Sequence, residues 1–190
     1  MTDLDTRPSP LDTVAVRAQD ALRSAAATPV GRPVVEALRG DEWLGRPLHP
    51  YVVAVPAVAF LAAAYFDRRA ARGDVDAEAR ADLALRVGVA GAVVAALTGQ
   101  AQFLETSGVA RRETTVHAVL NNAALGLQLA SLSARKRRRR GLGRALSLAA
   151  VSGLPISAAI GVDVASKLGK GFQIEAFRGA EPDAGAGSSR

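Results

Sequence analysis

The chain has 190 residues, which is enough for one domain, and 49% of them are hydrophobic. It contains no cysteine, so disulfides, thiolate zinc sites, iron–sulfur clusters and a cysteine nucleophile are excluded. The net charge of +6 does not predict a nucleic-acid partner, because the basic residues cluster beside hydrophobic segments and few aromatic residues could stack on bases. Arginine outnumbers lysine and alanine is abundant, which is typical of a GC-rich bacterial genome.

Residues 1–42 precede the first long apolar segment. Within them, residues 10–26 carry apolar side chains at roughly helical spacing, which predicts a weakly amphipathic helix that lies on the membrane or on a partner. No early basic region precedes an apolar core, so we expect no cleavable signal sequence.

Four segments of 18 to 20 residues contain no Asp, Glu, Lys or Arg. At about 1.5 Å per residue, a helix of that length spans roughly 30 Å, the thickness of the hydrocarbon core of a bilayer. Four such segments in so small a protein predict an all-α fold, a transmembrane up-and-down four-helix bundle. We expect a membrane domain at 43–172 and a disordered tail at 173–190, with the membrane helices at about 49–66, 87–104, 115–134 and 145–164.

Basic residues predict the orientation of this bundle. The segments 67–86 and 135–144 together hold 12 Lys and Arg residues. On the opposite side, 8 lie within about 20 residues of a predicted membrane helix, the range over which basic residues determine orientation. Because cytoplasmic loops carry the excess of positive charge, we expect both of these segments in the cytoplasm and both termini outside. The predicted location is the bacterial plasma membrane, which the chain crosses several times.

Small residues recur at every fourth position in two of the predicted helices, a spacing that lets helix backbones approach closely in lipid. They are Gly91, Ala95 and Gly99 in the second helix, and Gly153, Ser157 and Gly161 in the fourth. Pro155 should bend the fourth helix.

The two histidines of the chain, His49 and His117, each fall in the first turn of a predicted membrane helix. The first and third helices of an up-and-down bundle run parallel, so both histidines should lie at one face of the membrane and at similar depth. Asn121 lies one turn below His117 on the same helix face. Glu105 and Asp163 mark the ends of the second and fourth helices at the same level.

Polar residues inside membrane segments are candidates for a functional site, and several interpretations of this cluster stay open. The histidines and Asn121 could be structural and satisfy backbone groups of neighbouring helices. Two imidazoles from two helices of a bundle are also standard ligands of haem b. A divalent metal held by both histidines with Glu105 or Asp163, or a quinone or proton site, are further alternatives.

The order of three short motifs resembles a family of uncharacterised bacterial four-helix membrane proteins, catalogued as a domain of unknown function with a G-x-P-L-H-P opening. The first motif is Gly45–Pro50, followed by Pro56; the second is Thr98-Gly99; the third is His117-Ala118 with Leu120-Asn121. The resemblance covers roughly residues 43–172 and implies a four-helix membrane domain.

Members of that family are sometimes joined to Rieske-type iron–sulfur domains, and this implies electron transfer near a membrane. The chain departs from the family pattern at Gln102, where an acidic residue is usual, and in the glycines that end the fourth helix, which are kept only at Gly161 and Gly169. Without cysteine the chain cannot hold a Rieske cluster, so any redox partner is a separate protein.

Three functional hypotheses follow from the sequence. The first is a redox-associated membrane domain that binds haem b through His49 and His117, with Asn121 beside them. The second is an accessory or scaffold subunit without a cofactor, and the third is a metal-dependent membrane enzyme; the sequence favours a role other than catalysis. The expected partners are the lipid bilayer and either a redox protein or a second copy of the chain.

Overall fold

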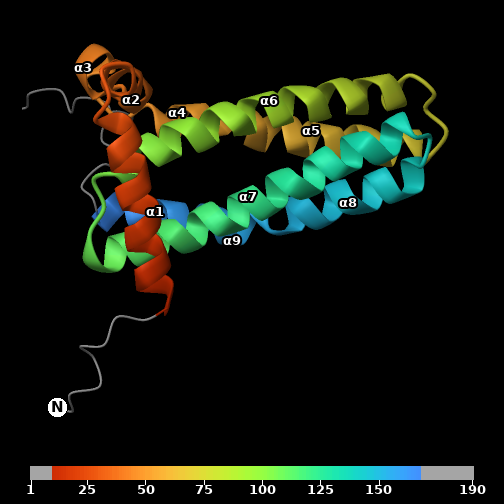
Figure 1. Cartoon of the computed structure of the whole chain (residues 1–190). Helices are drawn as coiled ribbons and strands as arrows, with labels where there is room; N and C mark the ends of the chain where they lie inside the picture. Colours follow the sequence, from red (N-terminus) through yellow and green to blue (C-terminus); the bar gives the residue numbers. More distant parts are fainter. Residues whose placement is uncertain (1–9, 168–190) are drawn as a thin grey trace, which may run out of the picture.

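A computed structural model gives the fold and describes residues 10–167 (Figure 1). The predicted disordered tail at 173–190 lies outside the described residues. Within the described range every regular element is a helix, and no strand occurs. The elements are α1 (Pro10–Ala26), α2 (Gly31–Arg39), α3 (Asp41–Leu44), α4 (His49–Val52), α5 (Ala54–Ala70), α6 (Ala77–Phe103), α7 (Gly108–Lys136), α8 (Arg140–Ser152) and α9 (Leu154–Lys167).

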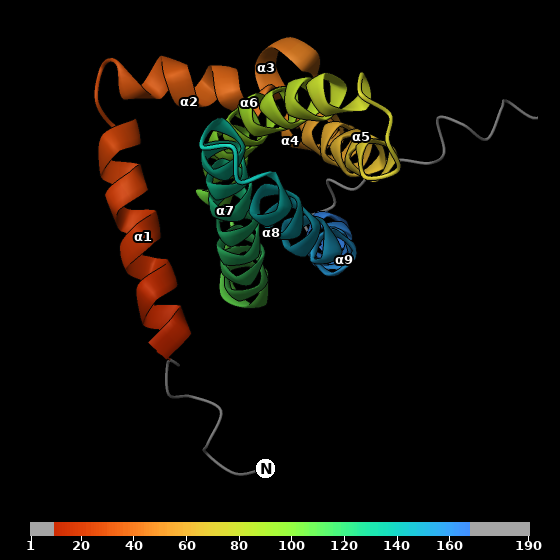
Figure 2. The same cartoon turned by 90° about the vertical axis from the view of Figure 1, so that its right-hand side faces the viewer.

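The long helices form two antiparallel hairpins that lie side by side (Figures 1 and 2). One hairpin pairs α4 and α5 with α6, and the other pairs α7 with α8 and α9. Between the hairpins, α6 contacts α7 and α5 contacts α8, so the α4–α5 arm and α7 are diagonal to each other. The turns at 71–76 and 137–139 lie together at one end, here called the loop end; the opposite end, where α4 begins, is the histidine end.

Two of the four arms are interrupted near a proline. The first arm breaks at Val53, between α4 and α5, and the last breaks at Gly153, between α8 and α9. Pro56 and Pro155 follow these breaks, and a proline has no amide hydrogen to donate to the preceding turn. The bend expected at Pro155 is therefore present.

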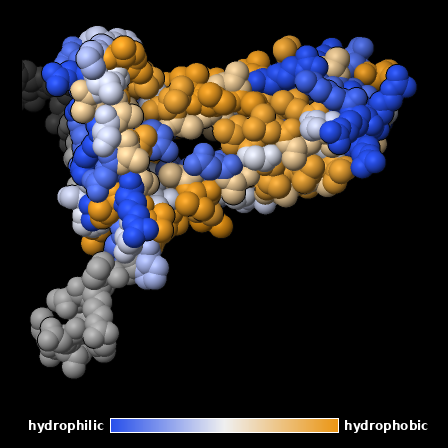
Figure 3. All heavy atoms as spheres, in the orientation of Figure 1, coloured by the Kyte–Doolittle hydropathy of each residue, from blue (hydrophilic) through white to orange (hydrophobic). Residues whose placement is uncertain are grey.

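The residues inside the hairpins are small or polar, whereas the large apolar side chains point outward. Phe60 and Leu85 are the large members of a buried core cluster that also contains Ala63, and alanines, valines and Leu132 pack against it. Val58, Leu97 and Leu148 are among the many large apolar residues that are exposed. A protein in water buries such side chains, so this distribution is the one expected of helices surrounded by lipid. Figure 3 shows the apolar surface along the long helices, with hydrophilic residues concentrated toward both ends.

Three helical arms are long and apolar enough to cross a membrane by length and composition: His49–Ala70, Ala77–Phe103 and Arg140–Ser166. The fourth arm, α7, has 29 residues, but its threonines, asparagines and serines lower its mean hydropathy. The sequence predicted four membrane helices from four segments without charged residues, and three arms among the described residues are apolar enough to span a membrane. The difference arises because α7 carries several polar residues, of which Gln128 and Ser131 are enclosed within the protein.

The helices at the loop end are longer than the charge-free segments suggested. α5 continues to Ala70, and α6 begins at Ala77 instead of near residue 87. The added turns contain Asp67 and Asp82. The sequence placed both residues in a loop, because the membrane helices were predicted from segments without charged residues. Both carboxylates are paired with arginines of the other hairpin, and this pairing allows charged turns to remain helical and packed.

A network of ion pairs joins the two hairpins at the loop end. The side chain of Arg135 on α7 is almost fully buried and binds Asp67 on α5 through both of its terminal nitrogens. The same guanidinium reaches Asp82 on α6 at 3.0 Å, and its Nε donates to Ser131 Oγ at 3.2 Å. One buried cation therefore connects three of the four arms.

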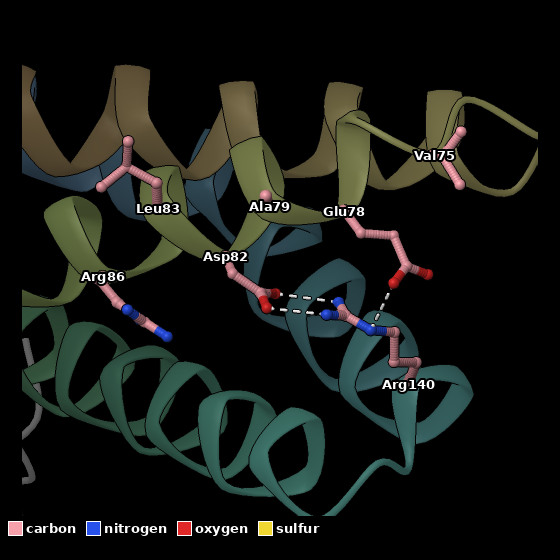
Figure 4. A pocket seen from close by; sticks show the side chains of 7 residues that line it. All are labelled: Val75, Glu78, Ala79, Asp82, Leu83, Arg86 and Arg140. Atoms are coloured by element: carbon pink, nitrogen blue, oxygen red, sulfur yellow. Dashed lines mark hydrogen bonds and ion pairs between the residues drawn. The ribbon is translucent and has the colours of Figure 1, made fainter.

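Two arginines of α8 complete this network. Arg140 donates to Asp82 at 2.9 and 3.1 Å and to Glu78 at 2.8 Å, and these contacts are visible in Figure 4. Arg144 donates to Glu78 at 3.2 Å and lies 3.7 Å from Asp67. The three arginines face three carboxylates, so the cluster is neutral overall, as a partly buried group of charges must be.

The predicted N-terminal helix corresponds to α1, which lies across the histidine end of the long helices (Figure 1). Its buried Gln19 donates to the carbonyl oxygens of Phe103 and Thr106 at 2.7 and 2.9 Å. Arg112 on α7 binds Asp12 through two hydrogen bonds of 3.0 and 2.7 Å. In the structure α1 therefore covers the turn between α6 and α7.

Replacing Arg135 should destabilise the protein strongly, because Asp67 would keep its buried charge without its main partner. We expect Arg135→Leu to lower the free energy of unfolding in detergent micelles by about 3–5 kcal/mol. Arg137→Leu is the matched control; that side chain is exposed, so its loss should change stability by no more than about 0.5 kcal/mol. Equal effects of the two substitutions would contradict the role given to the network.

Candidate functional site

His49 begins α4 and directs its imidazole against α6. Its Nδ1 lies 3.0 Å from Thr98 Oγ1, and the Thr98 hydroxyl itself donates to the Ala95 carbonyl oxygen at 3.0 Å. Because the hydroxyl hydrogen is used in that second bond, Thr98 accepts from Nδ1, and Nδ1 carries the imidazole proton. The lone pair of Nε2 is therefore not engaged in this interaction.

His117 has a similar arrangement in the second hairpin. Its Nδ1 lies 2.9 Å from the backbone carbonyl oxygen of Ser157 on α9. A carbonyl oxygen can only accept, so here too Nδ1 carries the proton and Nε2 keeps its lone pair. The Ser157 hydroxyl lies 3.3 Å from the same nitrogen and adds a second polar contact.

Each imidazole also lies against a glycine of the helix that accepts its hydrogen bond. A Cβ atom built on Gly99 would be 3.0 Å from Cε1 of His49, and one built on Gly161 would be 3.0 Å from Cε1 of His117. These spaces are too short for a side chain without a shift of the ring, so glycine lets each imidazole lie close to the helix backbone. The two hairpins thus hold their histidines in nearly the same way.

The two histidines lie at the same end of the molecule on diagonal arms. The two hairpins diverge toward this end, and the space-filling view shows a hollow between them beside α1 (Figures 1 and 3). Two half-buried imidazoles, each oriented by an Nδ1 hydrogen bond, are therefore presented from opposite arms.

The other residues predicted for the site have different surroundings. Asn121 donates from Nδ2 to the backbone carbonyl oxygen of His117 at 2.9 Å, so its amide is bound to its own helix. Glu105 follows α6 and forms an ion pair with Arg39 of α2. Asp163 is exposed on α9. Among residues 10–167, no three His, Asp or Glu side chains form a group that could hold a metal ion.

Neither the oxygen atoms that orient the histidines nor the network at the loop end was predicted from the sequence, where Thr98 stood out only within the Thr98-Gly99 motif. Ser157 and Gly161 were predicted only as small packing residues. The charge network had a recognisable signal: Glu78 and Asp82 are four residues apart on one helix face, and Arg140 and Arg144 have the same spacing. Complementary charges at the edges of neighbouring membrane segments predict such pairing.

An open cavity of about 440 Å³ lies at the loop end, toward the opposite end of the long helices from the histidines. Figure 4 shows the ion pairs of Arg140 along its wall and the Arg86 side chain beside them. The cavity is lined by Val75, Glu78, Ala79, Asp82, Leu83, Arg86 and Arg140. Its carboxylates are paired with arginines, so it offers no cluster of free acids.

Apolar outward faces and helices of membrane-spanning length define a helical membrane protein. A family model described as "Predicted membrane protein (DUF2231)" matches residues 45–173, and the chain belongs to this family. The match confirms the family resemblance noted in the sequence and covers nearly the same residues. No curated protein and no solved structure matches the chain.

Proposed function

We propose that the chain is a four-helix domain of the bacterial plasma membrane that binds haem b between His49 and His117. In this proposal α7 crosses the bilayer together with the three more apolar arms. Its length of 29 residues is sufficient, since roughly 20 residues span the hydrocarbon core. Its polar residues Gln128 and Ser131 are buried within the protein, so lipid would not contact them.

The observation that carries the haem proposal is the equivalent placement of the two imidazoles. Each donates from Nδ1 to an oxygen atom of the adjacent helix, at 3.0 Å for His49 and 2.9 Å for His117. Such a bond fixes the tautomer and leaves Nε2 as the ligand atom, which is the usual arrangement of metal-bound histidines. Two neutral imidazoles from facing helices are a common axial ligand set of haem iron.

The residues of this chain would have distinct parts in such a site. His49 and His117 would hold the iron, while Thr98 and the Ser157 carbonyl oxygen would keep the imidazoles in orientation. Gly99 and Gly161 would keep the rings close to the helices and leave the space between the hairpins open. Haem b, when bound, would supply one-electron transfer, and the surrounding apolar helices would limit the access of water.

An accessory or scaffold role without a cofactor is the second candidate, and one observation favours it. The same two histidine hydrogen bonds join the arms of each hairpin, as purely structural histidines would.

For either function, the proposed orientation places the loop end in the cytoplasm, where exposed Arg137, Arg138 and Arg139 meet anionic lipid headgroups. The proposed partner is a separate redox protein or a second copy of the chain.

Thiol labelling tests the orientation, because the chain has no native cysteine. With an impermeant reagent on intact cells, Ser107→Cys should be labelled, whereas Ala71→Cys and Arg139→Cys should react only after permeabilisation. Labelling of Ala71→Cys in intact cells would reverse the orientation. If Arg139→Cys reacted like Ser107→Cys, α7 would not cross the membrane.

Spectroscopy of protein purified from haem-replete cells tests the cofactor. We expect a Soret band that His49→Ala or His117→Ala abolishes, because each removes one iron ligand. Asn121→Ala should shift the band only slightly, since Asn121 contacts the backbone of His117. Asn122→Ala is the matched control on the exposed face of α7 and should leave the band unchanged.

The scaffold role predicts the opposite result in the same experiment. A folded, colourless protein would exclude haem binding. In that case each histidine substitution would cost roughly 1–3 kcal/mol of stability through an unpaired buried partner, with no spectral change.

A further inference from the structure

Two fully buried polar side chains without hydrogen-bond partners lie in the second hairpin, about two helical turns from the loop end. Gln128 on α7 is 1% exposed, and neither its amide nitrogen nor its amide oxygen has a partner. Ser147 on α8 is also 1% exposed, and its hydroxyl has none. These groups are far from the surface and cannot be satisfied by bulk solvent.

The antiparallel pairing of α7 and α8 places these residues at the same level. Ser131 on α7 donates to the Gly143 carbonyl oxygen on α8 at 2.6 Å. Gln128 precedes Ser131 by three residues and Ser147 follows Gly143 by four, so each lies one helical turn from that bond, in the same direction. Both side chains are enclosed, which places them on the inner faces of the two helices.

Leaving these atoms unpaired would be costly. A buried polar group without a partner costs about 1–3 kcal/mol, and lipid around the helices offers no substitute. Water would satisfy these groups, because an amide and a hydroxyl together supply donors and acceptors for the several hydrogen bonds that an internal water requires. Their chemistry therefore selects a small molecule that both donates and accepts.

We propose that Gln128 and Ser147 bind internal water between α7 and α8, and that this water extends the polar network of the loop end toward the middle of the membrane. Ser131 is the link, since it bonds Gly143 on one side and receives the Nε hydrogen of Arg135 on the other. The series Asp67, Arg135, Ser131 and Gln128 then forms a polar line from the loop end into the interior.

This hydrated site is independent of the haem proposal. It uses none of the residues around His49 and His117, and it would be present in a scaffold protein as well. With water at this site, the interior of the protein is hydrated on the side of the loop end. Water and protons would then enter the protein more deeply from that side than its apolar outer surface indicates.

Water-edited solid-state NMR on protein in lipid bilayers, labelled with ¹⁵N in glutamine side chains, tests the proposal. The Gln128 amide should receive magnetisation from water at short mixing times, and its signal is assigned by its loss in Gln128→Leu. Gln19 is the matched control, because it is equally buried but its amide donates to two carbonyl oxygens of the protein. Its transfer from water should be several-fold slower.

A second variant separates water from a direct contact between the two side chains. Ser147→Ala removes one of the groups that hold the water, so we expect the transfer to Gln128 to fall while Gln19 stays unchanged. If the Gln128 amide in the unsubstituted protein is as slow as that of Gln19, the site is dry and the proposal is overturned. An unchanged rate in Ser147→Ala would also overturn the assignment of Ser147 to the site.

Discussion

The bond between Arg135 and Asp67 is the constraint on which the arrangement of the two hairpins depends. Small residues and glycines can pack each hairpin within itself, but they do not determine how one hairpin is placed against the other. A buried cation tolerates few positions, because its charge must be matched and its hydrogen-bond donors satisfied. Arg135 meets both requirements by contacting α5, α6 and Ser131 of its own helix. This interaction fixes the axial position of α7 relative to the first hairpin.

The position of α7 in turn determines the level of His117. That residue stands five helical turns from Arg135 on the same inner face, so a helix anchored at the loop end places it toward the histidine end, where His49 begins α4. The hairpins are tied together by charge at one end and diverge at the other, where α1 crosses the turn between α6 and α7. The hollow seen between the hairpins lies toward this divergent end, beside α1 (Figure 3). The hairpins are therefore joined by ion pairs at the loop end and separated at the histidine end.

The sequence predicted the helical class, the apolar arms, the family and His49 at the start of a helix, because hydropathy and local spacing determine these features. His117 was also expected in the first turn of a helix, but α7 begins at Gly108, so His117 lies in its third turn. The sequence did not predict that Asp67 and Asp82 lie inside helices, since charge was taken as the mark of a loop and the partners are more than 50 residues away. It also could not identify the oxygen of Ser157 as the partner of His117, because a backbone carbonyl has no sequence signal. Glu105 was proposed as a metal ligand from its level in the membrane, yet Arg39 of α2 engages it. Contacts between distant segments account for each of these differences.

The central claim is that positions 49 and 117 face a common space from diagonal arms. It is tested most directly by cross-linking the double variant His49→Cys/His117→Cys, since no other cysteine competes. A short, membrane-permeant reagent with two thiol-reactive groups should join the two positions within one chain. It should leave His49→Cys/Val119→Cys unjoined, because Val119 is exposed on the outer face of α7. Absence of the 49–117 cross-link in folded protein, or equal cross-linking of the control pair, would contradict the claim.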